Sequence, residues 1–174
     1  MAATKRKILL IDLDPQGNAT MGSGIDKYEV EYSAYDLLVE DVPFDQVVET
    51  ETSGGYHVVA ANGDVTAAEV KMMEMYGREL RLKNALDKVK DQYDFIFIDC
   101  PPSLNMLTVN AMAAADSVIV PMQCEYYALE GLTALMDTIS QLASIVNPNL
   151  KIEGILRTMY DPRNRLASDV SEQL

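Results

Sequence analysis

Short aliphatic runs that end in an acidic residue or a proline recur along the chain, and they constrain its fold more than any other feature. Lys7 to Asp12, Asp94 to Asp99 and Ser117 to Pro121 have this form, and Tyr56 to Ala60 and Ile152 to Leu156 are two further candidates. Short apolar runs between such boundaries are typical of β-strands. The first three runs predict strands that are buried on both faces.

The segments between these strands carry apolar residues at helical spacing. Four helices are expected, over Ala67 to Met75, Arg78 to Lys90, Met106 to Ala115 and Leu129 to Val146. Strands that alternate with helices predict an α/β fold with a mostly parallel sheet and helices on both faces. In such a sheet ligands bind beyond the carboxyl ends of the strands, so we expect the functional residues to follow the strands directly.

Length and charge narrow the class of protein. The 174 residues are 48% hydrophobic and contain no repeat or low-complexity linker, so one domain over residues 1–174 is expected. The 27 acidic and 14 basic residues give a formal charge of -13, which repels phosphate backbones and requires any nucleic-acid contact to use a local basic patch. No segment approaches the roughly 18 uninterrupted apolar residues of a membrane span. A cytoplasmic protein is therefore expected.

The few thiol and imidazole side chains argue against a metal centre built from them. Cys100 and Cys124 form no CxxC pair, and with the single histidine they do not suggest a zinc or Cys/His catalytic site. Both thiols are expected to be reduced packing residues.

The methionines Met72, Met73 and Met75 suggest either an adaptable binding surface or core packing on a helix face, and we favour core packing.

Two carboxylates follow the first predicted strand. Asp12 and Asp14 have the same parity, so both point to one side at the mouth of the strand. A carboxylate there can accept a hydrogen bond from an attacking water, while Gly17 and Asn18 supply a tight turn that suits a nearby phosphate. The alternative is that Asp12 and Asp14 only cap a loop or a helix start. The pattern alone leaves both interpretations open.

A third carboxylate, Asp99, ends the strand that starts at Asp94. This is the form of a Walker B segment, in which an aspartate orients magnesium-bound water. Pro101 and Pro102 follow and stiffen the loop, which suits fixed carbonyls or a switch near a terminal phosphate. Many buried strands end in aspartate, so the value of Asp99 comes from its place at the same sheet edge as the first motif.

Four stretches together resemble the ParA/Soj family of chromosome- and plasmid-partitioning ATPases, which have a P-loop NTPase fold of the deviant Walker type. Leu9 to Thr20 (LLIDLDPQGNAT) resembles the family's second phosphate-side motif, and Phe97 to Ser103 (FIDCPPS) resembles its Walker B. Val120 to Leu132 and Gly154 to Asp161 resemble the next two segments, so the likeness covers nearly the whole chain.

The resemblance implies roles for individual residues. Asp14 would position the hydrolytic water and Asp99 would hold the magnesium shell. The residues expected to bind the nucleotide are Asp12, Gly17, Asn18, Pro101 and Pro102. Arg163 would lie near the arginine position that the family uses for non-specific DNA binding. The resemblance also implies ATP and Mg²⁺ as cofactors, a ParB-like partner, a homodimer on DNA, and association with the nucleoid.

The family's glycine-rich loop, KGGxGK[ST], does not occur in the sequence. Its backbone N–H groups cradle the phosphates and its lysines neutralise them. By the resemblance the chain is expected to be incomplete at both ends, to expose apolar sheet surface with unpaired edges, and to bind ATP weakly or not at all.

Three alternatives remain open. A non-catalytic protein would keep the family's partner surface without turnover. A MinD-like cell-division-site ATPase belongs to the same superfamily, although Tyr126, Tyr127 and the DPQGN wording favour ParA/Soj. A DxD phosphatase would use Asp12 as nucleophile and Asp14 as acid/base, and Gln16 fits such an enzyme poorly.

Overall fold

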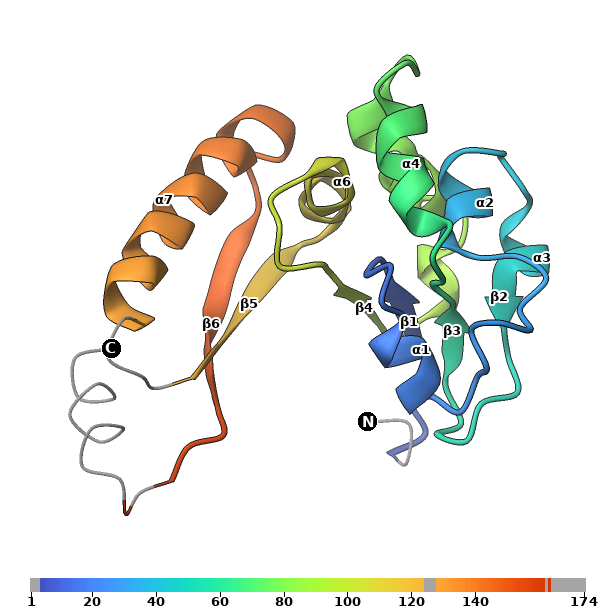
Figure 1. The fold of residues 1–174 in the computed structure, drawn as a ribbon, viewed down its shortest axis with the longest axis horizontal. Helices are drawn as coiled ribbons and strands as arrows, with labels where there is room; N and C mark the ends of the chain where they lie inside the picture. Colours follow the sequence, from blue (N-terminus) through green and yellow to red (C-terminus); the bar gives the residue numbers. More distant parts are fainter. Residues whose placement is uncertain (1–3, 124–127, 162, 164–174) are drawn as a thin grey trace. The chain divides into compact units, whose positions relative to one another are not determined.

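The computed structural model describes residues 4–123, 128–161 and 163. It divides the chain into two compact units, Met1–Ala114 and Ala115–Leu174, and each is described here by itself (Figure 1). The single domain expected from length and composition stays a prediction. The predicted segment from Val120 to Leu132 falls partly on residues 124–127, which lie outside the described residues, as do Tyr126 and Tyr127.

The first unit is built on a four-stranded sheet in the order β2-β3-β1-β4. β1 lies in the middle and pairs in parallel with β3 on one side and with β4 on the other. β2 is a two-residue strand that runs antiparallel to β3. The predicted parallel sheet is therefore confirmed, and the strands are β1 Ile8–Asp12, β2 Val48–Glu49, β3 His57–Val59 and β4 Phe95–Asp99.

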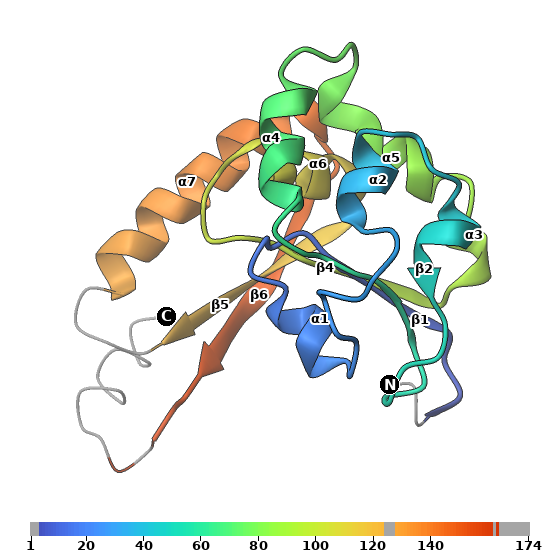
Figure 2. The ribbon, with the colours of Figure 1, turned by 45° about the vertical axis from the view of Figure 1, so that its right-hand side comes forward.

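Helices cover both faces of this sheet. Figure 2 shows α1 below the strands and α2, α4, α5 and α6 above them. The helices are α1 Asn18–Gly22, α2 Ala34–Leu38, α3 Phe44–Val47, α4 Val65–Met72, α5 Arg81–Leu86 and α6 Met106–Ala114, with 3-10 turns η2 Arg78–Leu80 and η3 Lys90–Gln92. The short helices α1 to α3 were not expected. Ser33 begins α2 through a capping box in which Asp36 accepts from the Ser33 backbone N–H.

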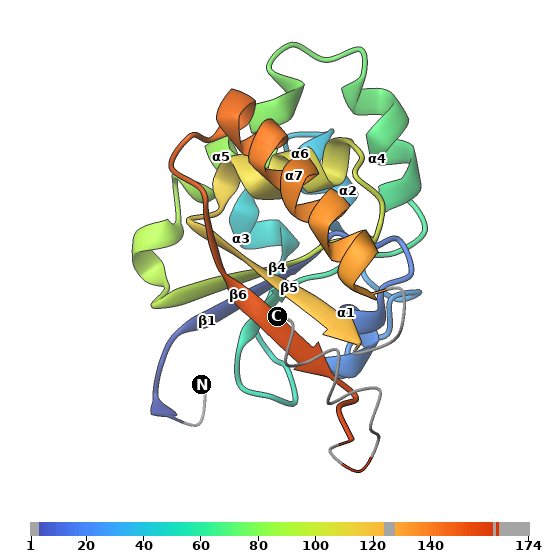
Figure 3. The ribbon, with the colours of Figure 1, turned by 90° about the vertical axis from the view of Figure 1, so that its left-hand side faces the viewer.

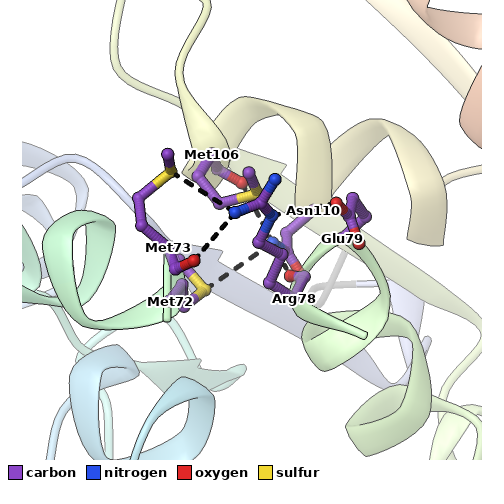
Figure 4. Close-up of polar contacts among 6 residues, drawn as sticks. All are labelled: Met72, Met73, Arg78, Glu79, Met106 and Asn110. Carbon is purple, nitrogen blue, oxygen red and sulfur yellow. Dashed lines mark hydrogen bonds and ion pairs between the residues drawn. The ribbon is translucent and has the colours of Figure 1, made fainter. Parts of the chain in front are cut away.

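The helix predicted over Arg78 to Lys90 is wrong in one respect, because it is broken into η2, α5 and η3. The buried amide of Asn110, on α6, causes the first break. Its Nδ2 donates to the Arg78 carbonyl at 2.7 Å (Figure 4). Its Oδ1 accepts from the Leu82 backbone N–H at 3.1 Å. Those two backbone groups would bond to each other in a continuous helix. The Asn110 side chain thus replaces one helical hydrogen bond and bends the chain there.

The core of this unit lies between the sheet and the helices α2, α4, α5 and α6. β1 is buried on both faces as predicted, since four of its five residues are buried and the fifth is half-buried. Its side chains Leu9 and Ile11 join a cluster of buried residues that includes Leu38, Val59 and Met72, all fully inaccessible. Successive buried positions in a strand are what a sheet covered on both sides requires.

β4 departs from the prediction of a strand buried on both faces. Phe95 and Phe97 are 45% and 39% exposed, and their rings stack 6.5 Å apart. β4 is the last strand of its sheet, so one edge and part of one face lack a neighbour within this unit. The expected exposure of apolar sheet surface is confirmed at these two residues.

The second unit is a βαβ segment. β5 Ser117–Gln123 and β6 Lys151–Thr158 pair in parallel, and α7 Ala128–Val146 connects them and lies alongside them (Figure 3). Ile139 and Ala143 of α7 are buried. The prediction that β5 is buried on both faces is wrong, because Ile119 is 51% exposed. The sheet has two strands, so each of them has an unpaired edge within the unit.

In the described part of the chain, no helix combines the length and the apolar character needed to cross a bilayer.

Candidate functional site

Strands β1 and β4 end side by side in an aspartate each. Asp12 and Asp99 are direct partners in the parallel register, and the Leu13 backbone N–H donates to the Asp99 carbonyl at 2.9 Å just beyond the last pair. Asp14 follows two residues later. The structure therefore places the three predicted carboxylates at one edge of the sheet, as the strand pattern requires.

Asp12 is completely buried, and its carboxylate is fully engaged inside the protein. Oδ1 accepts from the Asp14 backbone N–H at 3.0 Å, and Oδ2 accepts from the backbone N–H and the hydroxyl of Thr20, both at 2.8 Å. The Thr20 hydroxyl in turn accepts from the Ala61 backbone N–H at 2.9 Å. Asp12 thus ties the loop after β1 to helix α1 and to the end of β3.

Asp14 is half-buried and shapes a tight turn. Its Oδ1 accepts from the Gln16 backbone N–H at 2.9 Å, and its carbonyl accepts from the Gly17 N–H at 2.8 Å. These bonds use one side-chain oxygen of Asp14. Within the part of the chain that the structure describes, the other oxygen accepts no hydrogen bond and is available to a water or a ligand. Of the two carboxylates that follow β1, Asp14 is accordingly the one that can contact a bound water or ligand.

Gly17 completes the turn with a backbone conformation that needs glycine. Its φ is 63°, and a Cβ added there would lie 2.7 Å from the Ala61 carbonyl oxygen. The Lys27 ammonium donates to the Gln16 carbonyl beside this turn. Asn18, which is exposed, opens α1. Gly17 and Asn18 therefore lie where the sequence predicts a tight backbone turn, with one positive charge next to them.

Asp99 has an altered acidity. Partial burial raises the pKa of its carboxyl above the usual range, and the negative charges of Asp12 and Asp14 raise it further. The same surroundings raise the pKa of the Cys100 thiol to about 12, chiefly through burial. Cys100 is a free cysteine, as expected, and such a thiol is a packing group and not a nucleophile. Cys124 lies outside the described residues.

The loop after Asp99 leads directly into α6. Pro101 is buried and Pro102 is exposed. Asn105 then begins the helix, because its Oδ1 accepts from the backbone N–H groups of Leu107 and Thr108. The hydroxyl of Thr108 donates back to the Ser103 carbonyl at 2.7 Å. The stiff loop predicted from the two prolines is thus anchored at both ends, by β4 and by the cap of α6.

The donor set suits magnesium better than a metal held by protein alone. Among the residues that the structure describes, no group of three or more histidine, cysteine, aspartate or glutamate side chains is arranged to hold a metal ion. Mg²⁺ keeps several waters and is usually bound by one or two carboxylates together with substrate phosphates. Asp14 and Asp99, at the carboxyl ends of neighbouring strands, are carboxylates of the kind that such a site uses.

The remaining predicted residue, Arg163, belongs to the second unit. It is 90% exposed at its side chain and forms two hydrogen bonds with the Asp161 carboxylate, at 3.0 and 2.9 Å. The arginine lowers the pKa of Asp161. A phosphate that approaches Arg163 therefore has to compete with this ion pair.

Sequence reasoning missed two residues of the site. Thr20 was part of the motif but received no role, although a hydroxyl in the first helix after a buried strand-end carboxylate is a natural partner for it. Lys27 stands eleven residues after Gln16, and only the fold brings its ammonium to the turn. No local pattern points to Lys27.

Comparisons with known proteins agree on one kind of protein. The model of a family described as an AAA domain matches residues 1–152. An uncharacterized protein of Pseudomonas putida strain KT2440 is 61% identical over 174 residues, which are the whole of this chain and 66% of that protein. The sporulation initiation inhibitor protein Soj of Bacillus subtilis is 46% identical, again over the whole chain and 69% of the relative. The chain thus spans about two thirds of the relatives it matches.

Solved structures of similar fold include proteins with different descriptions. A Mycobacterium smegmatis structure described as cobyrinic acid a,c-diamide synthase with bound ADP and magnesium has a TM-score of 0.93 and 40% identity, and the match covers 99% of this chain and 70% of that one. A plasmid partition protein from Borrelia burgdorferi has a TM-score of 0.83 and 26% identity, with coverage of 99% and 74%. Both support a P-loop NTPase-like fold.

Proposed function

Since the chain belongs to the ParA/Soj family of chromosome-partitioning proteins, we propose that its strand-end loops form the carboxylate side of an ATP- and magnesium-dependent site that drives DNA segregation. The observation that carries the proposal is the pairing of Asp12 with Asp99 at one sheet edge, with Asp14 and the Gly17 turn beside them. The bound ADP and magnesium of the 40% identical Mycobacterium smegmatis structure support it.

Each residue has a distinct part in this site. Asp14 orients and accepts a hydrogen bond from the attacking water, because the bonds described leave one of its oxygens available. Asp99 holds the water shell of Mg²⁺. Asn18 brings its backbone N–H toward a phosphate, and the Gly17 turn, closed by its own N–H bond to the Asp14 carbonyl, sets the position of Asn18. Pro101 and Pro102 fix the loop next to it. Asp12 positions the loop and does not contact the nucleotide, since all its described bonds lie within the chain.

The burial of Asp12 also argues against the phosphatase alternative. A nucleophilic aspartate must present an oxygen to the phosphorus atom of a substrate. Asp12 is 0% exposed, and three protein hydrogen bonds hold its two oxygens. Covalent trapping of Asp12 by beryllofluoride would be needed to restore that alternative.

Phosphate binding requires more positive charge than this edge supplies. Lys27 lies beside the Gly17 turn, whereas three carboxylates lie at the strand ends. The loop KGGxGK[ST], which supplies lysines in this family, does not occur in the 174 residues. A polypeptide of these residues alone is therefore expected to bind ATP weakly. Submillimolar, magnesium-dependent binding in calorimetry would contradict this expectation.

The site is tested best in a chimera. The part of Bacillus subtilis Soj that aligns with this chain is replaced by these 174 residues, so that the rest of Soj supplies what they do not contain. The chimera should hydrolyse ATP. Asp14→Ala should abolish hydrolysis and leave ATP binding intact, while Asp99→Ala should weaken the magnesium dependence of binding.

Asp91→Asn is the matched control, because Asp91 is exposed and lies before β4, at the end of the strand opposite Asp99. It should leave hydrolysis unchanged. An Asp14→Ala chimera that turns over ATP at the unmodified rate would overturn the proposed role of Asp14.

Non-specific DNA binding through Arg163, a ParB-like partner, a homodimer and a cytoplasmic, nucleoid-associated location complete the proposal. The Arg163–Asp161 ion pair gives the DNA contact a specific test. Arg163→Gln should weaken binding of the chimera to a random 60-bp duplex and reduce its salt dependence, whereas Asp161→Asn should strengthen binding. Equal affinities for the two variants would remove Arg163 from the DNA contact.

A further inference from the structure

A shallow groove lies on the first unit between helix α4 and the start of α6. Its volume is about 600 Å³. We call it the α4–α6 groove, and its principal residues are Glu69, Val70, Met73, Glu74, Leu104 and Met106. It is separate from the strand-end carboxylates, and none of the roles proposed above uses it.

The walls of the groove are apolar and unusually open to solvent. Val70 is 70% exposed, Met73 is 55% exposed and Leu104 is 43% exposed. The preference for core packing of the methionine run is thus confirmed for Met72, which is 0% exposed, and wrong for Met73. Met73 keeps a helical backbone conformation directly after Met72. Successive helical side chains project roughly 100° apart, so Met72 faces the core and Met73 faces solvent. Adjacent exposed apolar side chains typically mark an interaction surface, and methionine adapts to varied partners.

The charge at the rim of the groove is negative. Glu69 and Glu74 line it, and among the ion pairs of the described residues neither carboxylate takes part. Glu69 accepts a hydrogen bond from the neutral amide of Asn105 at 3.1 Å. Arg78, whose guanidinium contacts Met73, is paired with Glu79 at 3.0 Å. The groove therefore offers an apolar floor with two carboxylates beside it.

The two walls are held in place before any partner arrives. The Arg78 guanidinium donates to the Met73 carbonyl at 2.8 Å, which fixes the end of α4 (Figure 4). Asn110 joins Arg78 to the Met106 carbonyl at the start of α6, and its amide also contacts the Met72 sulfur at 3.7 Å. A preformed surface loses less entropy on binding than a mobile one.

We propose that the α4–α6 groove binds a basic amphipathic peptide segment of another protein. Apolar side chains of the segment fill the space between Val70, Met73 and Leu104, and its lysines or arginines pair with Glu69 and Glu74. A second copy of this chain fits the groove poorly, because 27 acidic residues outnumber 14 basic ones and give each copy a charge of -13. A basic partner matches that charge.

The test uses the whole 174-residue chain and three labelled 18-residue peptides. The first carries leucine at helical i, i+3, i+4 and i+7 positions and lysine or arginine elsewhere; the second replaces the basic residues by glutamate, and the third replaces the leucines by serine. Fluorescence anisotropy should detect binding of the first peptide only. Failure of the first peptide to bind would overturn the proposal.

Paired variants locate the site. Glu69→Gln with Glu74→Gln should weaken binding roughly threefold to tenfold at low salt, as two exposed ion pairs would, and the difference should disappear near 1 M salt. Val70→Ser with Leu104→Ser should weaken it by about tenfold or more, because they remove the apolar contacts.

Matched controls separate the groove from general attraction to an acidic protein. Glu29→Gln with Glu31→Gln removes the same charge at exposed positions elsewhere, and Ile145→Ser changes another residue that is 77% exposed. Both should leave affinity unchanged. Control variants that weaken binding as much as the groove variants would overturn the proposal. So would sedimentation showing that the chain self-associates and that the Val70 and Leu104 variants abolish this, since the occupant would then be a second copy.

Discussion

The hydroxyl of Thr20 connects the buried Asp12 to the end of β3, and its removal tests how the site is held together. Thr20→Val has the same shape as threonine but lacks the hydroxyl. It deletes the 2.8 Å hydrogen bond to the Asp12 carboxylate and the 2.9 Å hydrogen bond from the Ala61 backbone N–H. Thr20→Ser is the matched control, because it keeps the hydroxyl and loses only a buried methyl group.

The expected free energies differ between the two variants. A buried N–H left without an acceptor costs about 1–3 kcal/mol, and a hydrogen bond to a charged group contributes about 1.5–3 kcal/mol. Thr20→Val should therefore lower the free energy of unfolding by roughly 3 kcal/mol. Loss of one buried methyl group in Thr20→Ser costs about 1 kcal/mol. The isosteric variant should be the less stable of the two by about 2 kcal/mol, a roughly 30-fold difference in the unfolding equilibrium.

Native-state hydrogen exchange measures this difference in the first unit directly. The amides of Ile11 and Val59 lie in strands β1 and β3 and report on opening of the sheet. Their protection should fall more in Thr20→Val than in Thr20→Ser, and urea unfolding should give the same order with an unchanged m-value. If Thr20→Val is as stable as Thr20→Ser, the hydroxyl does not connect Asp12 to Ala61, and the assignment of Asp12 as a positioning residue is wrong.

Four further changes have defined outcomes. Gly17→Ala should destabilise the chain by about 1–2 kcal/mol or more in urea unfolding, because the left-handed turn and the nearby Ala61 carbonyl exclude a Cβ, while Gly63→Ala, with open space around it, should stay within about 0.5 kcal/mol. Asn110→Ala should cost about 2–4 kcal/mol, since it leaves the Arg78 carbonyl and Leu82 N–H unpaired. Asp99→Asn should raise stability at neutral pH: the raised pKa of Asp99 favours its protonated form in the fold, so its contribution is present below pH about 4 and lost as the pH rises. Asp94→Asn should act oppositely, because the Lys7 backbone N–H and then Arg6 lower the pKa of Asp94, whose contribution is lost as the pH falls.

The parallel sheet could be predicted from sequence because its two longer strands have a local signal, an apolar run that ends in an acidic residue. The sequence predicts strands over Lys7 to Asp12 and Asp94 to Asp99 because each is an apolar run with an acidic end, and the structure assigns strands one residue shorter at the start, Ile8–Asp12 and Phe95–Asp99. Their adjacency followed from the topology of α/β sheets, and the register confirms it by placing Asp12 opposite Asp99. The position of each of these two strands could be predicted from its own residues.

The failures arise where a distant residue decides the outcome. The helix over Arg78 to Lys90 had the right spacing, but Asn110, thirty-two residues away, occupies the hydrogen-bond partners of its first turn. Similarly, the exposure of Phe95 and Phe97 depends on which strand forms the edge of the sheet, and a hydrophobic run does not carry that information. Local pattern predicts an element, whereas tertiary contacts decide where it breaks and which side stays open.

The two aspartates of the DLDPQGN loop illustrate how one motif combines structure and chemistry. Parity alone made Asp12 and Asp14 equivalent, since both point to the same side of the strand. Their burial differs. Asp12 is inaccessible and accepts hydrogen bonds at both oxygens, whereas Asp14 is half-buried and accepts a hydrogen bond at one side-chain oxygen. The Asp14 backbone N–H donates to Asp12, so the buried carboxylate fixes the position of the accessible one. The structure supports the loop-cap interpretation for Asp12, and our proposal gives the reactive role to Asp14. Replacing Asp12 should then disturb Asp14, although Asp12 itself contacts no ligand in the proposed site.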